Sequence, residues 1–211
     1  GNGLTAVKMA GVNFATETEK LIFAISTLQI LKKAVYLPPE KQRTEMESFY
    51  RTHAYLVEHT NAPVRRDLMD EIDWSDRLIG IKGTRGVGKT TFLLQYAKEK
   101  FGNDRSCLFI NMNNFYFSGH SIVDFANEFQ KRGGKVLLID QVFKHPEWSK
   151  ELRMCYDRYP NLKIVFTGSS VMRLKEENLE LRDIAKSYNL RGFSFRYPLR
   201  NNHSSSRGRR S

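Results

Sequence analysis

The 211-residue sequence predicts an α/β fold, a parallel five-stranded sheet flanked by helices and preceded by an N-terminal helical segment. Two observations carry this prediction. From residue 77 onward, short apolar runs alternate with helical stretches of roughly ten to fifteen residues, the pattern of a parallel sheet covered on both faces. A glycine-rich turn also joins the first apolar run to the first of these helices.

Five segments are expected to form the strands. Four of them are short apolar runs, and the fifth follows a charged stretch, about residues 171–188, that we expect to be helical. The expected strands are RLIGIKG (77–83), CLFINMN (107–113), KVLLID (135–140), LKIVFTGSS (162–170) and YNLRGFSF (188–195).

Three helices are expected to connect the first four strands. The first covers residues 89–102 and is stopped by Gly102. The second covers residues 121–134 and is closed by a pair of glycines, and the third, at 146–160, is bounded by prolines.

The chain before residue 73 is expected to be separate from this core. Residues 1–16 are small and polar, which predicts a mobile N-terminus, and residues 17–72 form the N-terminal helical segment. Within that segment a dense apolar pattern predicts a helix over Glu17 to Val35, and Pro38 and Pro39 open a second helix.

The second of these helices is broken at Asn61 and Pro63. A third short helix is expected where Val64, Leu68 and Ile72 recur at a spacing of four. The core then occupies residues 73–196, and residues 197–211 are rich in serine and arginine, which predicts a disordered basic tail.

Composition narrows the class of protein. Hydrophobic residues make up 40% and charged residues 27%, as in ordinary globular proteins. The longest uncharged stretch near the start, residues 21–31, is far shorter than the ~20 residues that a bilayer requires, so no membrane span is expected. Cys107 and Cys155 lie on apolar stretches, which predicts buried, reduced thiols and a cytoplasmic location.

The net charge of +11 is not confined to the C-terminus. Four arginines lie in the last fourteen residues without an acidic residue, and removing them leaves +11 − 4 = +7. A basic surface of this size is compatible with nucleic acid, although solvated faces and sites for anionic nucleotides also carry positive charge.

If the basic charge marks a nucleic-acid surface of the folded core, affinity for duplex DNA should fall steeply with salt concentration, because binding releases counterions. The affinity should also survive deletion of residues 198–211. Binding measured against salt concentration for both chains tests this, and loss of all binding on the deletion would assign the effect to the tail.

The stretch GTRGVGKTT, residues 83–91, is the strongest functional signal. A glycine, four residues, then Gly-Lys-Thr is the phosphate-loop (P-loop) pattern, in which glycines aim backbone N–H groups at one point. Lys89 would reach the β and γ oxygens of a nucleotide as a catalytic group, and Thr90 would place its hydroxyl on Mg²⁺. The expected nucleotide-binding residues are Gly83, Thr84, Arg85, Gly86, Val87, Gly88, Lys89, Thr90 and Thr91. The alternative is a strand-to-helix turn without a ligand.

Asp140 ends the strand KVLLID at the sheet edge where ligands gather in parallel sheets. It is expected to hold Mg²⁺ with Thr90, the alternative being an aspartate that caps the next turn. Gln141 then takes the catalytic position beside it. A glutamate here would polarise the attacking water, whereas a glutamine orients water but is a poor proton acceptor.

A further group of hydroxyls ends the strand LKIVFTGSS. If this strand lies beside the Asp140 strand, Thr167 or Ser169 can contact the γ-phosphate or its water. The alternative is a strand-end turn rich in small polar residues.

These motifs resemble the AAA-plus-type ATPases of bacteria and archaea over roughly residues 60–196. The resemblance depends on GTRGVGKTT, on the stretch from LLIDQVFKHPEW to KIVFTGSS, and on YNLRGFSFR. It implies a P-loop NTPase sheet of the additional-strand type, with one strand inserted between the phosphate-loop and aspartate strands. It also implies ATP with Mg²⁺, and Thr167 to Ser170 as the sensor of the γ-phosphate.

The sequence departs from that family at three points. Gln141 replaces the usual glutamate, and RDIAK (182–186) replaces a segment that usually carries a Gly-Arg pair, so Arg182 and Lys186 are only neighbours of that position. Relatives continue into a nuclease-like or winged-helix region, whereas here the core is followed by the basic tail. A truncated end, a frame-shifted end and an artificially added segment are alternative explanations of this tail.

Three functions therefore stay open from the sequence. The first is a Mg-ATP-binding switch with weak hydrolysis. The second is an active ATPase that remodels or scans nucleic acid, with Gln141 positioning water and an arginine supplied by a neighbouring subunit. A homo-oligomer or a partner protein is compatible with the sequence. The third is the non-enzymatic remnant core of a larger ATPase. We favour the first, because the phosphate loop is intact and the catalytic base is altered.

Overall fold

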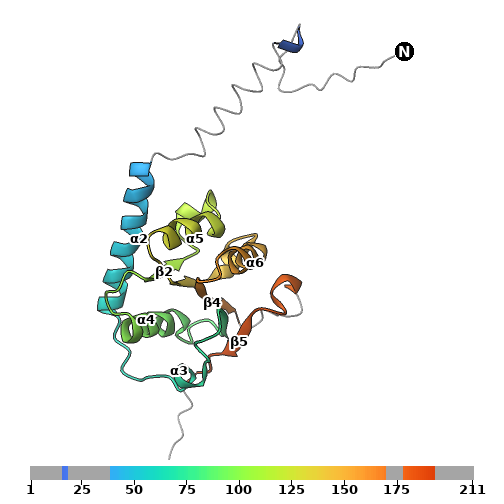
Figure 1. The fold of residues 1–211 in the computed structure, drawn as a ribbon. Helices are drawn as coiled ribbons and strands as arrows, with labels where there is room; N and C mark the ends of the chain where they lie inside the picture. The colour runs from blue at the N-terminus through green and yellow to red at the C-terminus, as the bar shows by residue number, and fades with distance from the viewer. Residues whose placement is uncertain (1–15, 19–38, 170–177, 193–211) are drawn as a thin grey trace, which may run out of the picture. The chain divides into compact units, whose positions relative to one another are not determined.

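The computed structural model describes residues 16–18, 39–169 and 178–192 (Figure 1). The chain divides into two compact units, Gly1–Ser48 and Phe49–Ser211. In the first unit the described residues are 16–18 and the beginning of helix α2 (Pro39–His59), which starts at a proline as expected. Most of the helix expected over residues 17–35, residues 1–15 of the N-terminus expected to be mobile, and the tail expected to be disordered fall outside the described residues.

The second unit is built on a parallel five-stranded sheet (Figure 1). The strand order is β2-β3-β4-β1-β5, so β4 lies between the phosphate-loop strand β1 and the aspartate strand β3. This arrangement confirms the expected α/β fold with an additional strand. The strands are β1 (Leu78–Gly83), β2 (Cys107–Asn111), β3 (Val136–Asp140), β4 (Lys163–Ser169) and β5 (Lys186–Asn189).

The fifth strand corrects the sequence prediction. It covers Lys186–Asn189 rather than residues 188–195, and it pairs with β1 at the edge of the sheet. The described part of the helix expected over 171–188 instead forms a short 3-10 helix, η3 (Leu179–Leu181), followed by turns. The residues of β5 are exposed or half-buried, so this edge strand has no apolar run by which the sequence could reveal it.

Helices cover both faces of the sheet. Figure 1 places α3 (Leu68–Glu71) and α4 (Lys89–Lys100) on one face, and α5 (Ile122–Lys131) and α6 (Trp148–Arg158) on the other. Every residue of β3 is buried, because its neighbouring side chains point to opposite, covered faces. Double coverage explains why the central strands read as continuous apolar runs.

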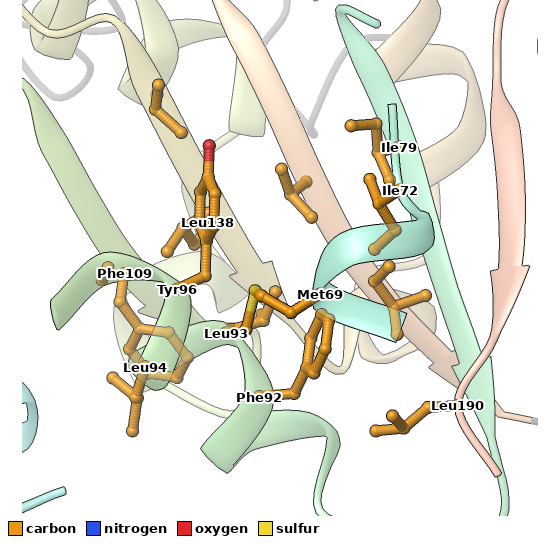
Figure 2. Close-up of a cluster of buried hydrophobic side chains, with 14 of the residues drawn as sticks. Met69, Ile72, Ile79, Phe92, Leu93, Leu94, Tyr96, Phe109, Leu138 and Leu190 are labelled. Carbon is orange, nitrogen blue, oxygen red and sulfur yellow. The ribbon is translucent and has the colours of Figure 1, made fainter. Parts of the chain in front are cut away.

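The face under α4 holds a continuous hydrophobic cluster, shown in Figure 2. Met69 lies near Phe92 of α4 in this cluster, and Ile72 lies near Ile79 of β1. The Trp74 ring stacks on Tyr96 with 3.8 Å between ring centroids. These contacts pack the segment around α3 against the helix that follows the phosphate loop. The domain boundary between residues 72 and 73 stays a prediction.

The outer edge of β2 is bonded to a histidine of α2 that lies in the second unit. The backbone N–H of Phe109 donates to Nδ1 of His53 at 3.0 Å, and the His53 side chain is buried. An edge strand leaves such N–H groups without a strand partner, and a buried one needs an acceptor. Burial lowers the pKa of His53 from 6.5 to about 4, which keeps Nδ1 free to accept.

This lowered pKa predicts a pH-dependent stability. Between pH 6.5 and about 4 the unfolded chain binds a proton at His53 that the folded protein does not. The neutral ring makes its full contribution to the free energy of unfolding above pH 6.5. As the pH falls toward about 4, this free energy decreases by roughly 1.4 kcal/mol per pH unit. Unfolding free energies of the wild type and of His53→Asn, which keeps an acceptor but does not titrate, test this. Equal slopes in that range would contradict it.

Both cysteines are free and buried, as expected. Burial raises the pKa of each thiol to about 12, so neither is a reactive thiolate at neutral pH. Of the helices within residues 16–18, 39–169 and 178–192, none combines the length and the apolar character that crossing a membrane requires.

Candidate functional site

The phosphate loop joins the end of β1 to the start of α4, as the sequence predicts. Gly88 has a φ of 95°, a left-handed conformation that glycine adopts without strain, and it caps the first turn of α4. A Cβ at Gly83 would lie 2.8 Å from the carbonyl oxygen of Leu190 and from a methyl of Val87. Only glycine fits at the point where strand becomes loop.

The tip of the loop faces solvent while its base is fixed. Thr84, Arg85 and Gly86 are exposed, and Val87 is buried in the cluster under α4. The guanidinium of Arg66 donates to the carbonyl oxygen of Val87 at 2.7 Å and to that of Arg191 at 2.9 Å. The loop is therefore tied to the segments before β1 and after β5.

Lys89 is folded back over the loop. Its Nζ donates to the carbonyl oxygens of Gly83 at 2.7 Å and Thr84 at 2.8 Å. Burial lowers the pKa of the Lys89 amine, and the negative charge of Asp140 opposes that shift. The ammonium group thus lies next to the loop, and a bound anion could accept the hydrogen bonds that its N–H groups now donate to these carbonyl oxygens.

Asp140 is the most buried acidic side chain of the site, with 1% of its surface exposed. Its Oδ2 accepts hydrogen bonds from the hydroxyl of Thr90 at 2.8 Å and from the amide of Asn111 at 3.1 Å. Its Oδ1 accepts from the hydroxyl of Thr167 at 2.6 Å. Residues from strands β2 and β4 and from α4 therefore hold the carboxylate at the end of β3 in a fixed orientation.

Gln141 follows Asp140 in an unusual backbone conformation. Its φ of 55° and ψ of 46° lie in the left-handed region, which costs a non-glycine residue on the order of 1 kcal/mol. Its backbone N–H donates to the Thr167 hydroxyl at 2.9 Å, and its side-chain Oε1 accepts from the amide of Asn113 at 3.1 Å. Both ends of the residue are held.

The hydroxyls of β4 lie in two different environments. β4 pairs with β3, so the strand that carries Thr167 and Ser169 does lie beside the strand that ends in Asp140. Thr167 is completely buried and its hydroxyl contacts Asp140 and Gln141. Ser169 is half-buried at the end of β4 and pairs with Gly83, beside the phosphate loop.

A hollow of about 270 Å³ adjoins the phosphate loop. One side is formed by residues 61–64 and Arg66, and the other by loop residues 86–88. Thr91, Phe92 and Gln95 of α4 complete the lining, and Thr91 is exposed.

Sequence reasoning missed three side chains of the site: Arg66, Asn111 and Asn113. The asparagines had a usable signal, because NMNN (111–114) ends an apolar run at the ligand-binding edge of the sheet. Arg66 had none, since its contacts to the loop depend on the folded path of the chain. Lys186 pairs with Ile79, at the end of β1 opposite the phosphate loop.

A comparison with protein-family models identifies the family of the domain that carries this site. A family model described as an AAA domain matches residues 75–198, which is more than half of the chain. Among solved structures, "Structure of C. elegans PCH-2" is similar with 20% sequence identity and a TM-score of 0.41. The similarity covers 71% of this chain and 42% of that one, so this chain spans less than half of that structure's length. No curated protein matches significantly. By the family match, the chain belongs to the AAA domain family of nucleotide-binding P-loop ATPases.

Proposed function

We propose that the protein binds Mg-ATP at the loop Gly83–Thr91 and acts as a nucleotide-dependent switch that hydrolyses ATP slowly. The observation that carries this proposal is the 2.8 Å hydrogen bond from Thr90 to Asp140. It joins the residue after the phosphate-loop lysine to a buried strand-end carboxylate fifty positions away, as a Mg-nucleotide site requires.

The oxygen donors fit Mg²⁺. This ion prefers oxygen ligands, keeps several waters, and is bound through one or two carboxylates together with substrate phosphates. Thr90 offers a hydroxyl and Asp140 a carboxylate at one position, and both would hold the ion, directly or through water. When bound, Mg²⁺ neutralises charge on the phosphates.

The phosphates of ATP would lie against the loop and the start of α4. Lys89 already directs its ammonium hydrogens to two backbone carbonyls of the loop, and phosphate oxygens compete well for such donors because the bonds are charge-assisted. The positive end of α4 favours an anion at the same place. The base and ribose would lie in the adjoining hollow of about 270 Å³, next to residues 86–88.

We expect slow hydrolysis because glutamine occupies position 141, where a glutamate would act as the general base. Gln141 has no basic atom at neutral pH, and its amide oxygen is already bonded to Asn113. Loss of a general base typically lowers a rate ~10²–10⁴-fold. ATP would therefore persist in the site, and its presence or absence would be the signal that a partner distinguishes.

Calorimetric titration of the wild type with ATP, in Mg²⁺ and then in excess EDTA, tests the binding part of the proposal. We expect one site, with tighter binding when Mg²⁺ is present. Absence of binding at millimolar nucleotide in both buffers would contradict it.

A further inference from the structure

The single hydrogen of the Thr167 hydroxyl is already donated to Asp140. A threonine hydroxyl has one hydrogen to donate and two lone pairs that accept. Thr167 donates to Oδ1 of Asp140 at 2.6 Å and accepts the N–H of Gln141 at 2.9 Å. A γ-phosphate oxygen only accepts, so Thr167 could bond it only by giving up Asp140. The side chain is also fully buried.

Asp140 needs such a partner to keep its orientation. Thr90 and Asn111 both bond Oδ2, and Thr167 bonds Oδ1, so the carboxylate is held from two sides. The same hydroxyl also holds the peptide of Gln141, which stands in a left-handed conformation. One side chain of β4 thus sets the geometry of two consecutive residues at the end of β3.

We propose that Thr167 is a positioning residue that orients Asp140 toward Mg²⁺ and fixes the backbone of Gln141, and that it does not contact the γ-phosphate. This inference rests on the proposed Mg-ATP site. Ser169 lies two residues further along β4, on the same side of the strand, and is half-buried beside Gly83. We therefore assign any phosphate contact from this strand to Ser169.

The variants Thr167→Val and Thr167→Ser separate the two roles. Valine keeps the shape of threonine but leaves Oδ1 of Asp140 and the N–H of Gln141 without this partner. Serine keeps the hydroxyl. Groups that orient a metal ligand typically change metal affinity 10–100-fold when they are removed.

The experiment titrates Mg²⁺ into each full-length variant at a fixed ATP concentration and follows nucleotide binding. ATP and ADP affinities are then compared in EDTA. We expect Thr167→Val to raise the Mg²⁺ concentration at half-saturation about 10–100-fold, with Thr167→Ser close to the wild type. The ratio of ATP to ADP affinity in EDTA should not change.

Two results would overturn the inference alone. One is an unchanged Mg²⁺ requirement in Thr167→Val while the wild type binds Mg-ATP. The other is a selective loss of ATP affinity over ADP affinity in EDTA, which would show a γ-phosphate contact. Failure of the wild type to bind Mg-ATP would overturn the proposed function as well.

Thermal melts of the free proteins establish that each variant is folded. If Thr167→Val does not fold, Thr167→Cys replaces it, since the thiol is a weaker donor of similar size. An intermediate rise in the Mg²⁺ requirement supports the inference, and no rise overturns it.

Discussion

Replacing Lys89 by alanine is expected to abolish the thermal stabilisation of the protein by Mg-ATP. The ammonium group stands at the loop, with Nζ 2.7 and 2.8 Å from two carbonyl oxygens that phosphate oxygens would replace as acceptors. A ligand that binds only the folded state stabilises it by RT ln(1 + [L]/Kd), about 2.7 kcal/mol at a hundredfold excess over Kd. Thermal melts with and without millimolar Mg-ATP measure the loss.

The free protein should melt at nearly the same temperature after this change. The variant loses two hydrogen bonds of a partly exposed side chain, which we expect to cost at most about 1 kcal/mol. Lys100→Ala, at the exposed end of the same helix, is the matched control and should keep the full stabilisation. Stabilisation of Lys89→Ala equal to that of the control would place the nucleotide elsewhere.

Gln141→Glu is expected to raise ATP turnover by roughly 10-fold or more, because a carboxylate is a far better proton acceptor than an amide of the same length. ATP affinity should stay nearly constant or weaken slightly from the added negative charge. Turnover at saturating Mg-ATP measures the effect, with Lys89→Ala as the blank.

Asn113 bears on the size of that gain. Its amide bonds the side chain of Gln141 at 3.1 Å, and a carboxylate there would be held more strongly because the bond becomes charge-assisted. A carboxylate bonded to Asn113 is less available to accept a proton from the attacking water. The double variant Asn113→Ala, Gln141→Glu should therefore hydrolyse ATP faster than Gln141→Glu alone. Brisk hydrolysis by the wild type, with no acceleration by either change, would place water activation at another residue.

The strands could be predicted where burial requires a run of apolar residues in the sequence. The four strands β1 to β4 are apolar because helices cover them on both faces, and their runs identify them. β5 lies at the edge with exposed and half-buried residues, so its position was predicted two residues late. Edge strands carry less burial, and a search for apolar runs finds them least well.

The site was predictable where a residue type has one strong use. Glycines in a strand-to-helix turn, a following lysine and a strand-end aspartate all indicate phosphate and Mg²⁺. The partners of Asp140 and Gln141 were harder, because asparagines have many uses and Asn111 and Asn113 acquire theirs only when β2 lies beside β3. The hydrogen bond from the Thr167 hydroxyl to Asp140 depends on the folded positions of β3 and β4, so the sequence alone does not reveal it.

A protein that holds Mg-ATP and hydrolyses it slowly should keep its bound nucleotide as ATP, so the fate of bound nucleotide distinguishes this function from the others. The wild type is loaded with Mg-ATP, freed of unbound nucleotide, and the ATP and ADP that remain bound are quantified over time. We expect the bound nucleotide to remain mainly ATP for minutes or longer. Conversion to ADP within seconds, or a protein that retains no nucleotide, would contradict it.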